Sequence, residues 1–189
     1  MHKHISTKKL VLTALMAALT VAGSYFRIKI PTEIAGTSAF HLGNIMCALS
    51  GILLGPWLGG AAAGIGSAIY DLFDPLYISD CWITFLTKGA YGIVSGLIAW
   101  GFSKEWNGSY LRACLATVAG ALTYAILYLA KSFFYSGLFL HGLTVEAAAL
   151  NLLSKLPATT FNAAVAILAA PLLAVALKKA LKSNHLTLD

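Results

Sequence analysis

Charged residues are scarce in this sequence. Asp, Glu, Lys and Arg make up 11% of the 189 residues, against roughly 25% in soluble domains, and 59% of the residues are apolar. The stretch from residue 34 to residue 70 contains no charged residue at all. Because a soluble core explains neither number, the composition indicates an integral membrane protein.

Cysteine pairs and enzyme motifs are also missing. The three cysteines are odd in number and lack paired spacing, which predicts neither a disulfide framework nor a metal knuckle. No paired-histidine metalloprotease box, nucleophile elbow or phosphate loop occurs. The 189 residues have room for about six spans of roughly 20 residues with their short loops, which leaves no room for a soluble catalytic or nucleotide-binding domain. We therefore expect a single membrane domain over residues 1–189, with no cofactor, no bound metal and no ATPase of its own.

The apolar runs predict helices rather than a membrane barrel. Backbone in hydrocarbon must satisfy its own hydrogen bonds, and the period-2 alternation of a barrel is absent. We expect an all-α bundle of six transmembrane helices, with a tight turn at Gly55-Pro56 between the second and third helices. Pro157 and Pro171 are expected to interrupt the sixth. The expected helices span residues 10–26, 38–54, 57–70, 82–100, 111–134 and 145–177.

Positive charge predicts the orientation of this bundle. The net charge is +6, but the basic residues cluster where spans end rather than along a polar face, so they indicate topology and not nucleic-acid binding. With both termini cytoplasmic, eight of the thirteen basic residues lie on the inner side of the membrane. These eight are Lys3, Lys8, Lys9, Lys104, Arg112, Lys178, Lys179 and Lys182. The outer connections are then the longer ones, so we expect a polar, ligand-sized site at the outer end.

Ionisable residues within the spans are candidates for that site. Charge near hydrocarbon costs a few kcal/mol by insertion scales, so such residues are often functional. Lys88, Lys131 and Lys155 could all point into one outward-facing cup, and the alternative is that they extend to the lipid headgroups. Asp71 also has two interpretations, because an acid at a helix end is an ordinary capping residue.

Neutral polar and aromatic residues extend the candidate set. His41 and Asn44 lie one helical turn apart, so they could meet either a ligand or a neighbouring helix. Asn162 follows Lys155 by two turns on the same face and has the same two interpretations. Outer aromatic residues form interfacial belts but can also stack on a flat ring. The residues expected to bind the ligand are His41, Asn44, Asp71, Trp82, Lys88, Tyr128, Lys131, Lys155 and Asn162.

Four segments carry a resemblance to a known family. They are the basic start followed by Ala14-Leu-Met-Ala-Ala18, the polar entry Phe40-His-Leu-Gly-Asn44, the run Gly51-Ile-Leu-Leu-Gly-Pro-Trp-Leu-Gly-Gly60 with Asp71 after it, and Pro157-Ala-Thr-Thr-Phe-Asn162. The third segment is the most specific, and the likeness covers nearly the whole chain. The sequence resembles the substrate-binding S components of the energy-coupling factor (ECF) vitamin transporters.

The resemblance implies a division of labour between this chain and its partners. An S component has six helices and binds a vitamin or vitamin precursor in a cavity near the outer face. It docks on a transmembrane coupling protein of the EcfT type, which two cytoplasmic ATPases drive. The alanine motif of the first helix belongs to the docking surface, so the resemblance assigns Ala14 and Ala18 to partner contact.

The substrate stays open at this point. The aromatic, His41 and asparagine set suits a small heteroaromatic ring such as hydroxymethylpyrimidine or a vitamin B6 form, which we favour. Converging lysines would instead suit a carboxylate such as pantothenate, and riboflavin is a further alternative. A different class of function is a membrane-embedded, metal-dependent lipid enzyme using Asp71, Asp74 and Asp80. An autonomous secondary transporter is less favoured because no inverted repeat is evident.

Overall fold

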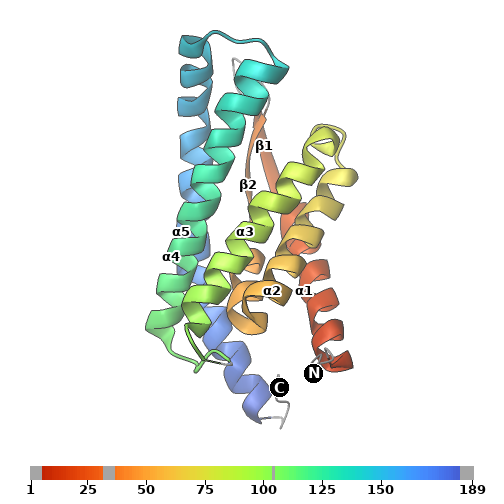
Figure 1. Cartoon of the computed structure of the whole chain (residues 1–189), viewed down its shortest axis with the longest axis vertical. Helices are drawn as coiled ribbons and strands as arrows, with labels where there is room; N and C mark the ends of the chain where they lie inside the picture. Colours follow the sequence, from red (N-terminus) through yellow and green to blue (C-terminus); the bar gives the residue numbers. More distant parts are fainter. Residues whose placement is uncertain (1–5, 32–36, 104, 184–189) are drawn as a thin grey trace.

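The computed structural model describes residues 6–31, 37–103 and 105–183. This part of the chain forms a bundle of long helices with one small antiparallel hairpin (Figure 1). The main elements are α1 (Thr7–Tyr25), β1 (Arg27–Pro31), β2 (Thr37–His41), α2 (Gly43–Leu72), α3 (Cys81–Trp100), α4 (Tyr110–Ala130) and α5 (Val145–Ser183). A short 3-10 helix, η1 (Ile78–Asp80), precedes α3, and a π-helix, η2 (Lys131–Leu140), continues α4. Within the described residues, five helical stretches are long and apolar enough to cross a membrane.

The element α2 doubles back on itself at Gly55. This residue has φ 82° and ψ 179°, a conformation that glycine adopts at little cost, and Pro56 follows it. A Cβ atom on Gly59 would lie 2.4 Å from the carbonyl oxygen of Ser50, although residues nine apart in a straight helix are separated by roughly 13 Å. The two arms of α2 therefore run antiparallel, and the reversal lies at the turn that the sequence predicts.

The hairpin is the main departure from the predicted all-α architecture. Residues 38–41 were expected to begin the second transmembrane helix, but they belong to β2, which pairs with β1 in the register Arg27↔His41 to Pro31↔Thr37. The prediction of a helix here is wrong because the absence of charge in so short a segment does not distinguish a strand from the start of a helix. The paired strand satisfies its backbone groups across the ladder, and the helix begins only at Gly43.

The end of the bundle also differs in detail from the prediction. The helix α5 continues through Pro157 and Pro171 without interruption, so the expected breaks are wrong. A neighbouring element can compensate the backbone groups that a proline leaves unpaired within a packed bundle. The predicted fifth helix ends as a π-helix rather than as α-helix, which places Lys131 at the first position of η2.

The element α2 lies at the centre of the bundle. In its most apolar 18-residue window 72% of the residues are buried, against 22–28% in the other four. Small residues allow this close packing, since a Cβ atom on Gly51 would lie 2.2 Å from the Gly92 carbonyl oxygen of α3. The pair Gly60 and Gly64 also faces α3, at Gly89 and Phe85 respectively. This glycine pair therefore packs inside the same chain.

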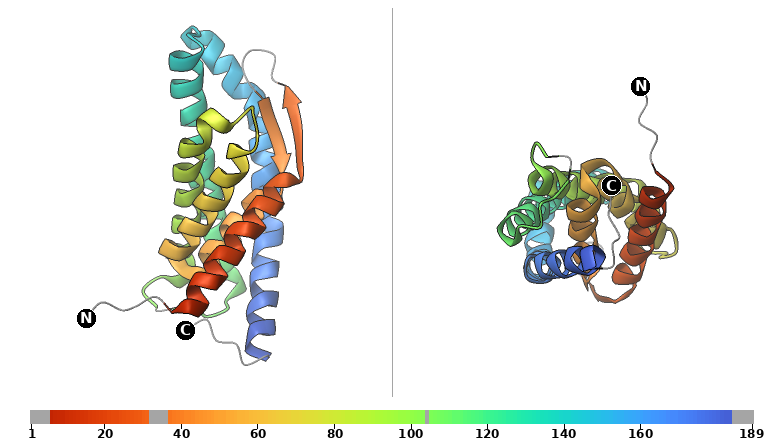
Figure 2. Two further views of the ribbon diagram at one scale, coloured as in Figure 1. Left: turned by 90° about the vertical axis from the view of Figure 1, so that its right-hand side faces the viewer. Right: turned by 90° about the horizontal axis from the view of Figure 1, so that it is seen from below.

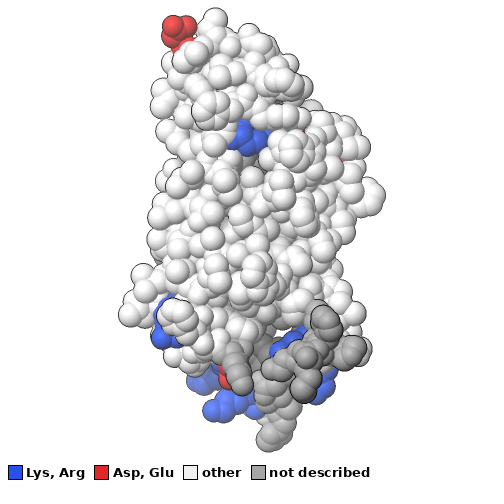
Figure 3. Space-filling model, viewed as in Figure 1, with Lys and Arg blue, Asp and Glu red and all other residues white. Residues whose placement is uncertain are grey.

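The two ends of the molecule differ in charge. The helix α1 begins and α5 ends at the same end, and the hairpin lies in the opposite half beside α5 (Figures 1 and 2). Lysine and arginine side chains gather at the end where α1 begins (Figure 3). The exposed members there include Lys8, Arg112, Lys179 and Lys182.

Candidate functional site

A cavity of about 290 Å³ lies between the hairpin, the end of α2 and helices α3, α4 and α5. Its charged and aromatic lining residues are Arg27, His41, Asp71, Tyr77, Asp80, Lys88, Tyr124, Tyr128, Lys131, His141 and Lys155. Seven of the nine predicted ligand-binding residues line it, namely His41, Asp71, Lys88, Tyr128, Lys131, Lys155 and Asn162. The fold thus brings together side chains that the sequence separates by more than a hundred residues.

Two predicted residues do not line the cavity. Asn44 is buried behind it and accepts a hydrogen bond from the Lys88 ammonium group, so it acts on the site through that lysine. The Trp82 side chain is 54% exposed and packs edge-on against Tyr135, with ring centroids 5.9 Å apart. The structure therefore brings Asn44 to the edge of the site and leaves Trp82 outside it.

Lys88, Tyr124 and Tyr128 form an aromatic wall of the cavity, and the fully buried Tyr91 packs behind this wall. The Lys88 nitrogen lies 3.7 Å from the centre of the Tyr124 ring, a cation–π arrangement. The Tyr124 ring is stacked between Tyr91 and Tyr128, with centroids 6.0 Å and 5.7 Å away and interplanar angles of 20° and 25°. Positions 124 and 128 share one face of α4 because they lie four residues apart. This wall can accept a flat ring.

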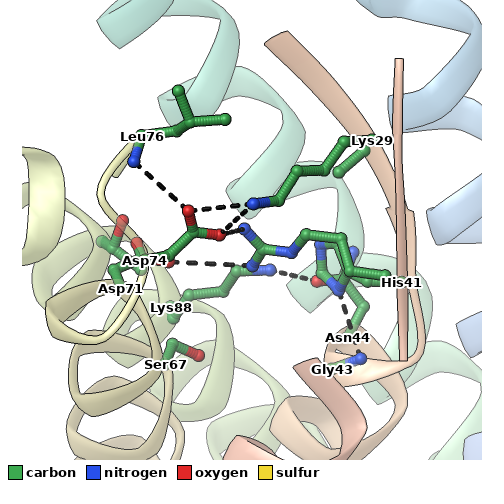
Figure 4. A network of polar contacts seen from close by, with 12 residues as sticks. Lys29, His41, Gly43, Asn44, Ser67, Asp71, Asp74, Leu76 and Lys88 are labelled. Atoms are coloured by element: carbon green, nitrogen blue, oxygen red, sulfur yellow. Dashed lines mark hydrogen bonds and ion pairs between the residues drawn. The ribbon is translucent and has the colours of Figure 1, made fainter. Parts of the chain in front are cut away.

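Lys29 of β1 meets the Asp74 carboxylate, which lies just after α2 (Figure 4). Arg27 of the same strand lies near Asp71 and Asp74. Lys29 Nζ lies 2.7 Å from Asp74 Oδ2, and Arg27 lies 3.7 Å from Asp71 and 3.9 Å from Asp74. The guanidinium group also covers the Tyr70 and Tyr77 rings, at 4.3 Å and 4.8 Å. The hairpin is thereby held to α2 by ion pairs.

The environment of Asp74 favours its ionised form. Burial acts to raise the pKa of this carboxyl, but the Lys29 hydrogen bond, the Leu76 backbone N–H and the positive charges of Lys29 and Arg27 outweigh burial. The pKa of Asp74 is consequently lower than its usual value. An ionised Asp74 can hold both cations of β1.

His41 presents a neutral imidazole to the cavity. The Gly43 backbone N–H donates to His41 Nδ1 at 3.2 Å, so the proton of the neutral ring belongs on Nε2. Burial, followed by the positive charges of Lys88 and Arg27, lowers the pKa of His41 well below 6.5. The ring therefore remains uncharged at neutral pH and has one N–H group to donate.

Asn162 fixes β2 to α5 through both halves of its amide. Its Oδ1 accepts a hydrogen bond from the His41 backbone N–H at 2.9 Å, and its Nδ2 donates to the Ala39 carbonyl oxygen at 2.8 Å. Sequence reasoning left open whether this residue meets a ligand or another element. The geometry supports a role in positioning the hairpin over the cavity.

Two lysines at the other side of the cavity have different surroundings. Lys131 donates to Asp80 Oδ2 in an ion pair. The second carboxylate oxygen, Asp80 Oδ1, is buried and has no hydrogen-bond partner in the described part of the chain. Lys155 is 6% exposed. Among the described residues, no ion pair or hydrogen bond involves its ammonium group.

Several lining residues escaped the sequence analysis. Arg27, Thr84, Thr87 and Tyr124 line the cavity but are absent from the set of residues predicted to bind the ligand. A signal existed for Tyr124, which precedes Tyr128 by one helical turn. Nothing comparable identified Arg27, because its role depends on the hairpin that the sequence analysis missed.

Comparison with known proteins identifies the family. The profile described as "ECF-type riboflavin transporter, S component" matches residues 4–179. The chain belongs to this family. It is also 35% identical over 120 residues to a protein of Pyrococcus woesei described as "Uncharacterized protein in gap 3'region", an alignment that covers 64% of this chain and 74% of that protein. The resemblance read from the sequence is confirmed.

Membership of this family settles the general role of the chain. It is a membrane-spanning S component, a transport subunit of the vitamin-uptake class rather than an enzyme. The competing interpretation as a lipid enzyme needed Asp71, Asp74 and Asp80 to hold a metal. In the structure these carboxylates face Arg27, Lys29 and Lys131 instead. Among the described residues, no three His, Cys, Asp or Glu side chains lie close enough together to ligate an ion.

The predicted docking residues of the S component lie on an open helix face. Ala14 and Ala18 are exposed on α1, one turn apart, next to the exposed Leu15 and Leu19. The opposite face of α1 is buried, since the Ala17 carbonyl oxygen would lie 2.4 Å from a Cβ atom on Gly66 of α2. A second helix can therefore reach the backbone of α1 at the two alanines.

Proposed function

We propose that this S component captures a water-soluble vitamin or vitamin precursor at the outer face of a prokaryotic plasma membrane and delivers it to an ECF importer. The observation that carries the proposal is the cavity of about 290 Å³, which lies beside the hairpin and away from the basic end of the bundle. Its charged groups and stacked tyrosines give it the mixed polar and aromatic lining of a small-molecule site.

The topology that we propose has six crossings with both termini in the cytoplasm. The reversal at Gly55 supports two crossings within α2, which makes an even total with the other four long helices. The exposed Lys8, Arg112, Lys179 and Lys182 support a cytoplasmic location of the end where α1 begins, because basic residues are in excess on that side. The cavity then opens towards the outside.

Transport requires partners in this proposal. The S component binds a transmembrane coupling protein of the EcfT type, and two cytoplasmic ATPases supply the energy. The exposed Ala14 and Ala18 support a docking surface on α1, since small residues let a second helix approach closely.

For the substrate we favour a small heteroaromatic ring, either hydroxymethylpyrimidine or a form of vitamin B6. The stacked Tyr124 and Tyr128 support a flat ligand, and the cavity is at the small end of the range of about 300–1,000 Å³ usual for ligand pockets. Riboflavin, which the family description names, and pantothenate are the alternatives.

Two measurements test this function. Mass analysis of the small molecule that copurifies with the detergent-solubilised protein should identify a vitamin or precursor. Proteoliposomes that contain this chain, the coupling protein and both ATPases, with the ATPases on the inner side, should take up that compound only when ATP is enclosed in the lumen. Uptake by this chain alone, without partners or ATP, would contradict the proposal and indicate an autonomous transporter.

A further inference from the structure

The charged side chains around the cavity do not balance. Five cations line it or pair with its lining, and three carboxylates do so, which leaves an excess of two positive charges among the described residues. The cations are Arg27, Lys29, Lys88, Lys131 and Lys155, and the carboxylates are Asp71, Asp74 and Asp80. Glu33 lies outside the described residues and is not included in this count.

Each of the three carboxylates already has a cationic partner. Asp71 lies 3.7 Å from Arg27, and Asp74 lies 2.7 Å from Lys29. Asp80 pairs with Lys131. The ion pairs of the three aspartates are thus with Arg27, Lys29 and Lys131. Lys88 and Lys155 form no ion pair within the described residues, although Asp71 and Asp80 act on them at longer range.

Lys88 and Lys155 are the cations left over, and both are buried at 5% and 6% exposure. The Lys88 ammonium has neutral partners, the Asn44 carbonyl group and the Tyr124 ring. The Lys155 ammonium has no such partner in the described part of the chain, although the residue lines the cavity. Lys155 is thus the cation most in need of an external partner.

Burial of an unpaired ammonium group is unfavourable. Water no longer solvates the charge, and the cost is recovered only when an opposite charge or several acceptors approach it. Within a membrane protein such residues commonly mark a substrate pathway. A ligand with negative charge would supply the missing compensation at this position.

We propose that the natural substrate carries an anionic oxygen group, a carboxylate or a phosphate, which Lys155 binds while the rest of the molecule lies against Tyr124 and Tyr128. Lys88 adds the second positive charge through its place beside Tyr124. This inference rests on the proposed function and narrows its substrates: of the two favoured there, it retains a phosphorylated vitamin B6 form and removes the neutral hydroxymethylpyrimidine, and of the two alternatives, it retains pantothenate and removes riboflavin.

Matched pairs of neutral and anionic compounds test the inference. The pairs are nicotinamide and nicotinate, pantothenol and pantothenate, pyridoxal and pyridoxal 5′-phosphate, and riboflavin and its 5′-phosphate. Titration calorimetry on the detergent-solubilised full chain should show at least one anion binding about tenfold or more tightly than its neutral partner, because charge-assisted hydrogen bonds are the stronger ones. The pair that responds distinguishes a carboxylate site from a phosphate site.

Variants of one residue give the decisive contrast. Lys155→Gln should lower the affinity for that anion by about 10- to 100-fold and leave the affinity for the neutral partner unchanged. Lys155→Arg should retain most of the affinity for the anion. Lys179 is exposed at the far end of α5, and Lys179→Gln is the control, which should change the affinity for neither compound. Equal weakening of both members by Lys155→Gln would overturn the inference, because it would indicate a structural lysine.

The inference can fail while the proposed function stands. If the neutral member of every pair binds as tightly as the anion, the substrate is not recognised by charge, and the chain is still a vitamin-binding S component. If no member of any pair binds, the inference falls. The proposed vitamin-binding role falls with it only if hydroxymethylpyrimidine does not bind either and the reconstituted importer takes up none of these compounds.

Discussion

The side-chain oxygen of Asn162 accepts a hydrogen bond from the backbone N–H of His41 at 2.9 Å, across 121 residues of sequence. The same amide donates to the Ala39 carbonyl oxygen at 2.8 Å. Asn162 thereby acts towards β2 as a neighbouring strand would, with one acceptor and one donor. A single side chain of α5 therefore closes the edge of the hairpin that covers the cavity.

The first prediction concerns this attachment of the hairpin. Asn162→Ala should reduce both the free energy of unfolding and that of ligand binding by about 1 to 3 kcal/mol, because two backbone groups of β2 lose their partner. Hydrogen exchange should accelerate at the His41 amide, which a ligand contact without a positioning role would not cause. The losses in Asn162→Asp should lie between those of the wild type and Asn162→Ala. A carboxylate still accepts a hydrogen bond from the His41 N–H but cannot donate one to the Ala39 carbonyl oxygen.

A second asparagine on α5 provides the control for that experiment. Asn151 is fully buried on the same helix, and its side-chain atoms have no hydrogen-bond partner among the described residues. Asn151→Ala should leave exchange at the His41 amide unchanged. Equal acceleration in both variants would mean that any loss within α5 loosens the hairpin, which would contradict a specific role of Asn162.

The second prediction concerns the stability of the protein without ligand. Lys155→Met removes a buried charge that has no partner within the described residues, so the ligand-free protein should gain about 1 kcal/mol or more of unfolding free energy. Lys88→Met should gain less, because it leaves the Asn44 carbonyl group without its donor. Thermal unfolding in detergent measures both, and a less stable Lys155→Met variant would show that the lysine has a structural role.

The long helices could be predicted from the sequence, but the β1–β2 hairpin beside the cavity could not. Hydrocarbon allows few backbone conformations, so apolar runs identified the helices, and Gly55-Pro56 marked the reversal within α2. The strand over residues 37–41 was missed because five uncharged residues are too few for a periodicity that separates a strand from the start of a helix. The attachment of this strand to α5 comes from Asn162 far along the chain, which no local pattern reveals.

The sequence predicted many of the residues that line the cavity, but not which of its lysines forms an ion pair with a carboxylate. Ionisable residues in an apolar chain stand out, and Lys88, Lys131 and Lys155 all line one cavity. Which lysine finds a carboxylate depends on where separate helices place their side chains. Lys131 meets Asp80 because η2 begins beside η1, whereas Lys155 meets no carboxylate within the described residues. Spacing in the sequence contains no information on this difference.

The third prediction concerns acid sensitivity through His41. Its pKa is lowered in the folded protein, so the folded state binds this proton less readily than the unfolded state. Stability from this residue is full above the ordinary pKa of 6.5 and should fall as the pH drops below it, by at most about 1.4 kcal/mol per pH unit. The unfolding midpoint should therefore change less with pH, between pH 7.5 and 5, in His41→Gln than in the wild type.

The fourth prediction separates docking from binding. Replacement of both Ala14 and Ala18 by leucine should abolish uptake in the reconstituted importer, because larger side chains keep a second helix away from α1. Vitamin binding by the isolated chain should be unchanged, since Ala14 and Ala18 are exposed on α1 and neither of them lines the cavity. Leu122→Trp on α4, where the leucine is 59% exposed, tests whether bulk on any outer surface is harmful. Lost binding in the alanine variant would mean that this face of α1 supports the fold, and intact uptake would move the docking surface elsewhere.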